Sequence, residues 1–167
     1  FSSVAILFRA QSLQATAEMD QVLKNETFGL ASLINIDHGT FDFEMSSNFL
    51  SQYQQRNPAG FFRFVDLATS QILKESIGAP KIDCMNTTSH ESVKYENHEY
   101  RVSVYKFRPE VETEAEDAQV EYGPEVCLVV GVDEGPYQAT VMNVLFSTIP
   151  LLAGIFILCL KYFKEKT

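Results

Sequence analysis

Apolar positions are concentrated in one long block near the C-terminal end of the chain. Ala139 to Leu160 are 22 consecutive residues without a charge. A helix rises about 1.5 Å per residue, so roughly 20 such residues cross the hydrocarbon of a membrane. Lysines and aromatic residues follow at 161–166, as is typical of a cytoplasmic boundary. The pattern predicts a transmembrane helix over residues 139–163 and the start of a cytoplasmic segment at 164–167; a buried core helix is the alternative.

A second apolar stretch opens the chain. Phe1 to Phe8 reads FSSVAILF and runs into Arg9 without a signal-peptide cleavage site. We interpret residues 1–8 as the end of a first transmembrane helix, and residues 9–138 as an extracytoplasmic sensor domain. The expectation is a fragment of a multi-pass membrane protein whose output domain is absent.

Within residues 9–138, helical and strand patterns alternate. Residues 9 to about 34 contain no proline and predict a helix, with Leu13, Ala17, Leu23 and Leu30 roughly on one face; this helix could pair with a second copy. Residues 37–39 predict a turn, 41–44 a short strand, and 46–55 a brief helix that buries Tyr53. Residues 60–66 predict a strand, with a return strand beginning at Ile72; residues 77–95 give no clear assignment.

The later part of the domain predicts two longer strands. Residues 98–109 alternate, with Tyr100, Val102 and Val104 on one side and Arg101 on the other, whereas the continuous apolar run 126–132 predicts a buried, central strand. An acidic connection over residues 110–125 joins them. The predicted fold class is α+β: a small PAS-like antiparallel sheet with a long N-terminal helix and a C-terminal transmembrane helix.

Charge and cysteine content limit the partners. The chain has 13 basic and 22 acidic residues, for a net charge of −9, which argues against a nucleic-acid-binding surface. Cys84 and Cys127 lie in the predicted outer domain, where an oxidising compartment permits a disulfide, but spacing alone does not show whether they pair. No cysteine or histidine spacing indicates a metal site.

The order of these landmarks resembles the N-terminal sensor region of bacterial two-component histidine kinases. The resemblance is carried by FDFEMSSNFLSQYQ, FFRFVDLATSQILKES, HEYRVSVYKFRPEVE and LVVGVDEGPYQATVMNVLF, and it covers essentially the whole chain. The chain departs from the family in having Ala68, Thr69 and Ser70 at the hairpin turn and no tryptophan in the preceding strand. The resemblance implies a homodimer in the bacterial inner membrane. It also implies a kinase domain beyond Thr167 that uses ATP and Mg, with a response regulator as its partner.

Several residues are candidates for binding. Arg63 and Arg101 lie in predicted strands, where they could meet an anionic ligand or simply face solvent. The acidic connection could bind cations, since oxygen ligands suit hard cations, or be a solvated loop. Its candidate cation-binding residues are Glu110, Glu112, Glu114, Glu116 and Asp117.

Two further groups bear on sensing and transmission. His38, His90 and His98 could report pH or be ordinary surface residues. Gly135, Pro136 and Pro150 are the candidate signal-transmitting hinge. Gly135 and Pro136 link the strand predicted at 126–132 to the span, and Pro150 removes a helical hydrogen bond, which could make a hinge or only a structural kink.

No catalytic residues or cofactor site are predicted within these 167 residues. The sequence therefore favours an extracytoplasmic input module that relays a stimulus to a histidine kinase. Two alternatives remain. The chain could be the input domain of a chemoreceptor or another membrane receptor, or it could be a membrane-anchored binding protein without signalling.

Overall fold

The computed structural model describes most of the chain and divides it into two compact units. The described residues are 2–44, 53, 60–84, 87, 90–112, 120–140, 142–144, 146–147, 150, 154 and 162. One unit is Glu18–Glu134. The other consists of Phe1–Ala17 together with Gly135–Thr167. The chain passes from one unit to the other after Ala17 and again after Glu134.

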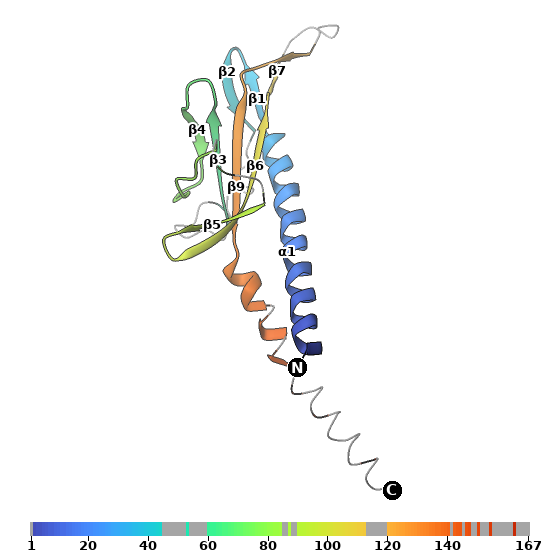
Figure 1. Cartoon of the computed structure of the whole chain (residues 1–167). Coiled ribbons are helices and arrows are strands. Elements are labelled where there is room, and N and C mark those ends of the chain that lie inside the picture. The colour runs from blue at the N-terminus through green and yellow to red at the C-terminus, as the bar shows by residue number, and fades with distance from the viewer. Residues whose placement is uncertain are drawn as a thin grey trace. The chain divides into compact units, whose positions relative to one another are not determined.

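Helix α1 (Ser2–Ala31) opens the chain and belongs to both units (Figure 1). It contains no proline, so its hydrogen-bonded ladder is not interrupted. The amide of Ser32 donates to the carbonyl of Phe28 at 3.1 Å at the end of the helix. The sequence predicted a helix to about residue 34; the structure ends it three residues earlier because Ile34 begins a strand.

The longer strands of the Glu18–Glu134 unit form an antiparallel sheet in the order β4-β3-β9-β6-β5. Its members are β3 (Gly60–Asp66), β4 (Ile72–Glu75), β5 (Glu91–Tyr95), β6 (His98–Phe107) and β9 (Val126–Asp133). The predicted hairpin of β3 and β4 and the central position of β9 are confirmed. Strand β5 lies in the part of the sequence that had no assignment, since its ESVKY pattern has little apolar content.

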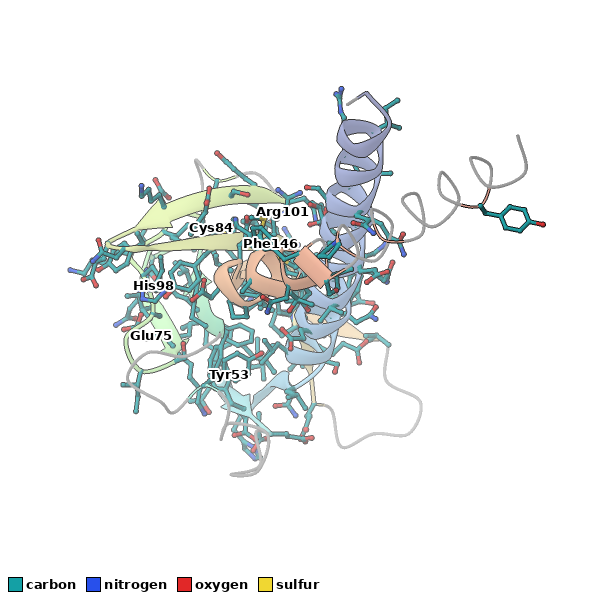
Figure 2. The ribbon with its side chains drawn as sticks, turned by 90° about the horizontal axis from the view of Figure 1, so that it is seen from below. Tyr53, Glu75, Cys84, His98, Arg101 and Phe146 are labelled. Atoms are coloured by element: carbon teal, nitrogen blue, oxygen red, sulfur yellow. A yellow bond between two sulfur atoms is a disulfide. The ribbon has the colours of Figure 1, made fainter. Side chains whose placement is uncertain are left out.

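One face of this sheet packs against α1. The α1 residues Leu23 and Leu30 are fully buried against side chains from β3 and β9. The buried cluster comprises Leu23, Leu30, Ile34, Tyr53, Phe62, Phe64, Val126, Leu128 and Val130. Figure 2 shows the Tyr53 ring inside the domain, where it meets Phe62 edge-on with ring centroids 5.1 Å apart. Leu13, predicted on the same helix face, belongs to the other unit and is 64% exposed.

The opposite face of the sheet carries a second core. It contains Phe61, Ile82, Cys84, Tyr100, Val102, Cys127 and Val129. A disulfide between Cys84 and Cys127 ties the segment after β4 to the central strand, with Cα atoms 6.5 Å apart. The predicted alternation of β6 is confirmed, since Tyr100 and Val102 lie on this face.

A smaller sheet has the strand order β2-β1-β7-β8. Its strands are β1 (Ile34–Asp37), β2 (Thr40–Phe43), β7 (Glu110–Val111) and β8 (Glu121–Tyr122). The turn at residues 37–39 joins β1 to β2 as predicted. The parallel pairing of β1 with β7 was not foreseen, because it joins strands that lie far apart in the sequence. The described part of the chain is therefore α+β, with a long N-terminal helix and two largely antiparallel sheets.

The C-terminal part of the chain is helical from residue 135 in its described residues. No helix among the residues described is both long and apolar enough to cross a membrane. Much of the predicted span at 139–163 and most of the predicted brief helix at 46–55 lie outside the described residues.

Candidate functional site

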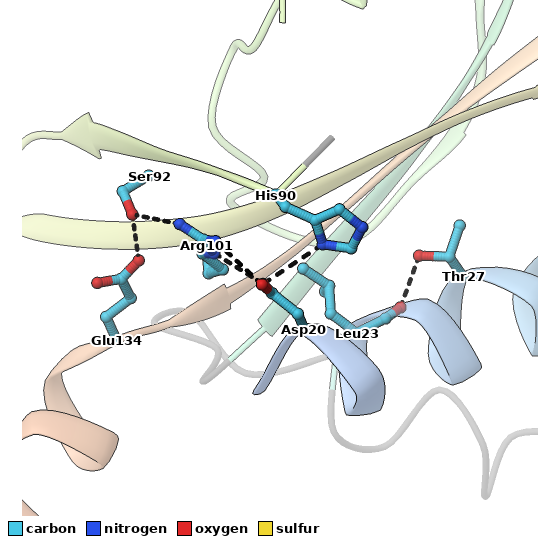
Figure 3. A network of polar contacts seen from close by, with 7 residues as sticks. All are labelled: Asp20, Leu23, Thr27, His90, Ser92, Arg101 and Glu134. Atoms are coloured by element: carbon cyan, nitrogen blue, oxygen red, sulfur yellow. Dashed lines mark hydrogen bonds and ion pairs between the residues drawn. The ribbon is translucent and has the colours of Figure 1, made fainter. Parts of the chain in front are cut away.

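A carboxylate on α1 and a guanidinium on β6 form the centre of a polar network in the Glu18–Glu134 unit (Figure 3). Arg101 donates from Nε to Asp20 Oδ1 at 2.8 Å and from Nη2 to Asp20 Oδ2 at 3.0 Å. This is a two-pronged, charge-assisted pairing, which is stronger and more directional than a single contact. The side chains are only 17% and 26% exposed, so water screens the pairing less than at an open surface.

The network continues from Arg101 to the end of β9. Arg101 Nη1 donates to the Ser92 hydroxyl at 3.2 Å, and that hydroxyl donates to Glu134 Oε1 at 2.5 Å. The Glu134 amide also donates to the Glu99 carbonyl at 2.8 Å. Three hydrogen-bonding steps therefore connect a side chain of α1 to a side chain at the end of the central strand.

His90 places a third side chain next to the same carboxylate. Its Nδ1 lies 3.3 Å from Asp20 Oδ1, on the side of Asp20 that also meets Arg101 (Figure 3). The backbone of His90 is held in place by its amide, which donates to the Val102 carbonyl at 2.7 Å.

Electrostatics of the network follow from these contacts. The hydrogen bond from Arg101 is the main reason that the pKa of Asp20 is lowered, although burial of the carboxyl opposes it. The same hydrogen bond raises the pKa of Arg101 above its usual range. Both groups are thus held in their charged forms at neutral pH, as a lasting link between α1 and β6 requires.

The two ends of the network lie close to the two boundaries of the Glu18–Glu134 unit. Asp20 is the third residue of the Glu18–Glu134 unit and Glu134 is its last. The network therefore connects residues next to both points at which the chain enters and leaves this unit. Neighbouring Asp133 is also paired, since its Oδ2 lies 2.9 Å from His98 Nδ1.

The predicted anion-binding arginines are both engaged by carboxylates of the chain. Arg63 bonds to Glu75 Oε2 from Nε at 2.8 Å and from Nη2 at 2.7 Å. Its Nη2 also donates to the Ala79 carbonyl at 3.2 Å, which holds the segment after β4 against the sheet. Arg63 and Arg101 are not brought together, and an anionic ligand would compete with Glu75 or Asp20 for either guanidinium.

The predicted cation-binding residues are only partly described. Glu110 lies in β7 and Glu112 follows it, where its carboxylate accepts a hydrogen bond from the Asn35 amide. Glu114, Glu116 and Asp117 lie outside the described residues. Within the described part of the chain, no three histidine, cysteine, aspartate or glutamate side chains are grouped to hold a metal ion.

The predicted hinge residues fall at the second unit boundary or beyond it. Gly135 and Pro136 are the first helical residues after β9, and proline is well tolerated in a first helical turn. The Thr140 hydroxyl donates to the Pro136 carbonyl at 2.9 Å. Pro150 is a helical residue of the same unit. Their role in transmission stays a prediction.

Sequence reasoning identified Arg101 but not its partner. Asp20 is one acidic residue in a helix of mixed polarity, and nothing in its spacing to Arg101, 81 residues away, marks the pair. The only signal for this pair in the sequence was an acidic residue in the helix that covers a strand with an arginine. Comparison with known proteins adds nothing to this site, because no family model, curated protein or solved structure matches the chain.

Proposed function

We propose that this chain is the extracytoplasmic input module of a membrane-bound signalling receptor of the histidine kinase type. The observation that carries the proposal is the network from Asp20 through Arg101 and Ser92 to Glu134. It connects the two points at which the chain enters and leaves the sheet domain. A stimulus that changes the domain would act on both connections at once, as an input module requires.

Two further features support an outer location and a sensor fold. The Cys84–Cys127 disulfide suits an oxidising compartment such as the periplasm. The five-stranded antiparallel sheet has its first and last strands in chain order, β3 and β9, side by side at its centre. That arrangement, with α1 along one face, is compatible with a PAS-like sensor.

In this proposal the stimulus selects between two arrangements of the domain, and it acts only to the extent that it binds them with different affinity. The change passes from β9 through Gly135 and Pro136 into the C-terminal helix. Residues 139–163 would cross the bacterial inner membrane and contact its lipid. A kinase domain supplied with ATP and Mg would then phosphorylate a response regulator, with the receptor acting as a homodimer.

The first test is the coding sequence that follows Thr167. We expect a phospho-acceptor helix and an ATP-binding domain there. A stop codon soon after Thr167 would favour an anchored binding protein, and a methyl-accepting or other output domain would assign the same input module to a different class of receptor.

The second test uses the full-length receptor in lipid vesicles, with autophosphorylation as the readout. We expect Arg101→Lys to change the basal autophosphorylation rate several-fold, because lysine keeps the charge but cannot form the two-pronged pairing with Asp20. Glu96→Gln, which removes an exposed carboxylate outside the network, is the matched control. Equal rates for wild type and Arg101→Lys would remove the network from the transmission route.

A further inference from the structure

The hairpin of β5 and β6 contacts residues next to both boundaries of its unit. On the α1 side, His90 Nδ1 lies 3.3 Å from Asp20 Oδ1, and Arg101 pairs with both oxygens of the same carboxylate. At the end of β9, the Ser92 hydroxyl donates to Glu134 Oε1 and accepts from Arg101 (Figure 3). This hairpin therefore holds α1 and the end of β9 at the same time.

The two strands of the hairpin differ in how firmly they are attached. β6 pairs along its length with β9, and the Glu134 amide donates to the Glu99 carbonyl at 2.8 Å. β5 is an edge strand of the sheet, as Figure 1 shows. None of its residues is fully buried, although Val93 and Tyr95 are half-buried against the second core, whereas the first six residues of β9 are all buried. Segments with few buried apolar contacts open locally at the lowest free energies, so β5 should separate from the sheet far more readily than β9.

Both ends of β5 have a strained backbone. His90, directly before the strand, has a φ of 65°, and Glu96, directly after it, has a φ of 53°. Residues with a Cβ rarely adopt this left-handed conformation, because the Cβ comes too close to a carbonyl oxygen and the conformation costs free energy. Glu96 is also the first residue of the two-residue turn between Tyr95 and His98, a position that favours glycine when φ is positive. Such conformations persist only where neighbouring contacts hold them, and release of β5 would relieve both.

We propose that β5 is a releasable strand that alternates between a docked and an undocked position on β6. Undocking breaks the link that Ser92 makes between Arg101 and Glu134. It also removes His90 from Asp20, whereas the pairing of Arg101 with Asp20 stays because these groups belong to β6 and α1. The side-chain route from α1 to the end of β9 is thus complete only with β5 docked. That the two positions transmit different signals rests on the proposed function; the release itself does not.

Hydrogen exchange of the whole chain in lipid vesicles tests the release directly. Mass spectrometry of peptides that cover β5 gives the exchange rate of its amides. We expect Glu96→Gly to slow this exchange about threefold or more, because glycine adopts a positive φ without a Cβ clash and so stabilises the docked strand. Glu96→Gln removes the same carboxylate but keeps the Cβ, and should leave the exchange rate near that of the wild type.

Ser70→Gly is the matched control for backbone strain. Ser70 is exposed, has a φ of 57° and lies in the hairpin of β3 and β4. Glycine at this position should relieve a similar strain without acting on β5, so the exchange of β5 should stay unchanged. Equal slowing of β5 exchange by Ser70→Gly and Glu96→Gly would overturn the proposal, because β5 would then open only when the whole domain unfolds.

Removal of the Ser92 hydroxyl should have the reverse effect. Ser92→Ala loses the hydrogen bonds with Arg101 and Glu134, so we expect β5 to exchange about threefold faster. Ser92→Thr keeps a hydroxyl and suits a strand, and its exchange rate should stay near that of the wild type. An unchanged rate in Ser92→Ala would overturn the proposal, since the hydroxyl would then not hold the strand.

Autophosphorylation of the full-length receptor in lipid vesicles tests the consequence for signalling. Glu96→Gly favours the docked strand and Ser92→Ala the undocked one, so their basal rates should move in opposite directions from wild type, each about twofold or more. Movement in the same direction, or no movement, would overturn β5 as the switch. The two measurements fail separately. Unchanged exchange rejects the releasable strand without rejecting the input module, and loss of the kinase expectation leaves the exchange result intact.

Discussion

Glu26 lies on α1, and burial is the main reason that its pKa is raised; a hydrogen bond from the Tyr53 hydroxyl opposes the shift. A carboxyl whose pKa is raised in the folded state favours folding when protonated, and loses that contribution as the pH rises through its folded pKa. At neutral pH the ionised Glu26 is therefore a local cost to the free energy of folding.

Glu26→Gln should consequently stabilise the protein at pH 7, by up to about 1 kcal/mol, because the amide keeps an acceptor for Tyr53 without a buried charge. Below about pH 4 the gain should vanish, since Glu26 is then protonated in both states. Urea unfolding midpoints at the two pH values provide the measurement, with Glu18→Gln on the same helix as the control. A gain that persists unchanged in acid would show that removal of the charge is not the cause.

For Asp20, stability depends on pH in the opposite direction. Its pKa is lowered in the folded state, mainly by the hydrogen bond from Arg101, so its contribution to stability is present above the unfolded value of about 3.9 and is lost as the pH falls through the folded value. Asp20→Asn should cost about 1–3 kcal/mol at neutral pH, because the largely buried Arg101 guanidinium loses its counter-charge. The difference from wild type should shrink below about pH 3. Asp37→Asn, at an exposed position, should change the urea midpoint little at either pH.

Two glycines provide a matched comparison of packing. A Cβ at Gly131 in β9 would lie 2.1 Å from Cε1 of the buried Phe61 ring, whereas a Cβ at Gly29 in α1 meets nothing within 4 Å. Gly131→Ala should therefore destabilise by about 1–3 kcal/mol through overpacking. Gly29→Ala should stabilise by about 0.5–1 kcal/mol through helix propensity. Chemical denaturation measures the free energy of unfolding of the two variants. A change of the same sign in both would contradict this explanation.

At the scale of elements, the segment between β4 and β5 depends on a few long-range connections. It contains little regular structure in its described residues and is attached by the Cys84–Cys127 disulfide and by the bond from Arg63 to the Ala79 carbonyl. These two attachments hold Ile82 over Phe61 and Val129 in the second core. The face of the sheet away from α1 is thus covered by a tethered segment instead of a helix.

Removing the disulfide with Cys84→Ser and Cys127→Ser should cost about 2–4 kcal/mol, because the bridge closes a loop between residues separated by 43 positions. Urea unfolding with and without reductant measures the loss. Cys159→Ser is the control and should leave both the midpoint and its response to reductant unchanged. Alkylation of both Cys84 and Cys127 in the native, unreduced protein would contradict the bridge.

At the scale of the whole molecule, α1 leaves part of its surface available for self-association. Ile6 and Leu13 are 67% and 64% exposed and lie one heptad apart, hence on one side of the helix. Two apolar residues in such positions are what a paired helix in a homodimer would bury.

We expect a Leu13→Cys variant of the whole chain in lipid vesicles to form an intersubunit disulfide several-fold faster than a Gln14→Cys variant, whose side chain is about 100° away around the helix. The measurement is dimer formation over time on non-reducing gels, after mild oxidation. Equal rates for the two variants would indicate random collision and would count against pairing through this face.

Much of the domain could be predicted from local patterns alone. Alternation in residues 98–107 and the continuous apolar run at 126–132 identified two strands and their faces, because a side-chain period of two and burial on both faces leave a direct signature in the sequence. The hairpin of β3 and β4, the turn at residues 37–39 and burial of Tyr53 followed from equally local signals. The apolar block at 139–160 and the net charge of −9 are likewise properties of the sequence itself.

Tertiary structure alone decided which distant residues meet. The pairing of Asp20 with Arg101, the parallel contact of β1 with β7 and the Cys84–Cys127 bridge join positions between 43 and 81 residues apart. No periodicity encodes such contacts, since they depend on how the sheet is ordered and on which face α1 covers. For the same reason Arg101 was visible in the sequence as a charged strand residue, while its role as the link between α1 and Glu134 became apparent only in the folded domain.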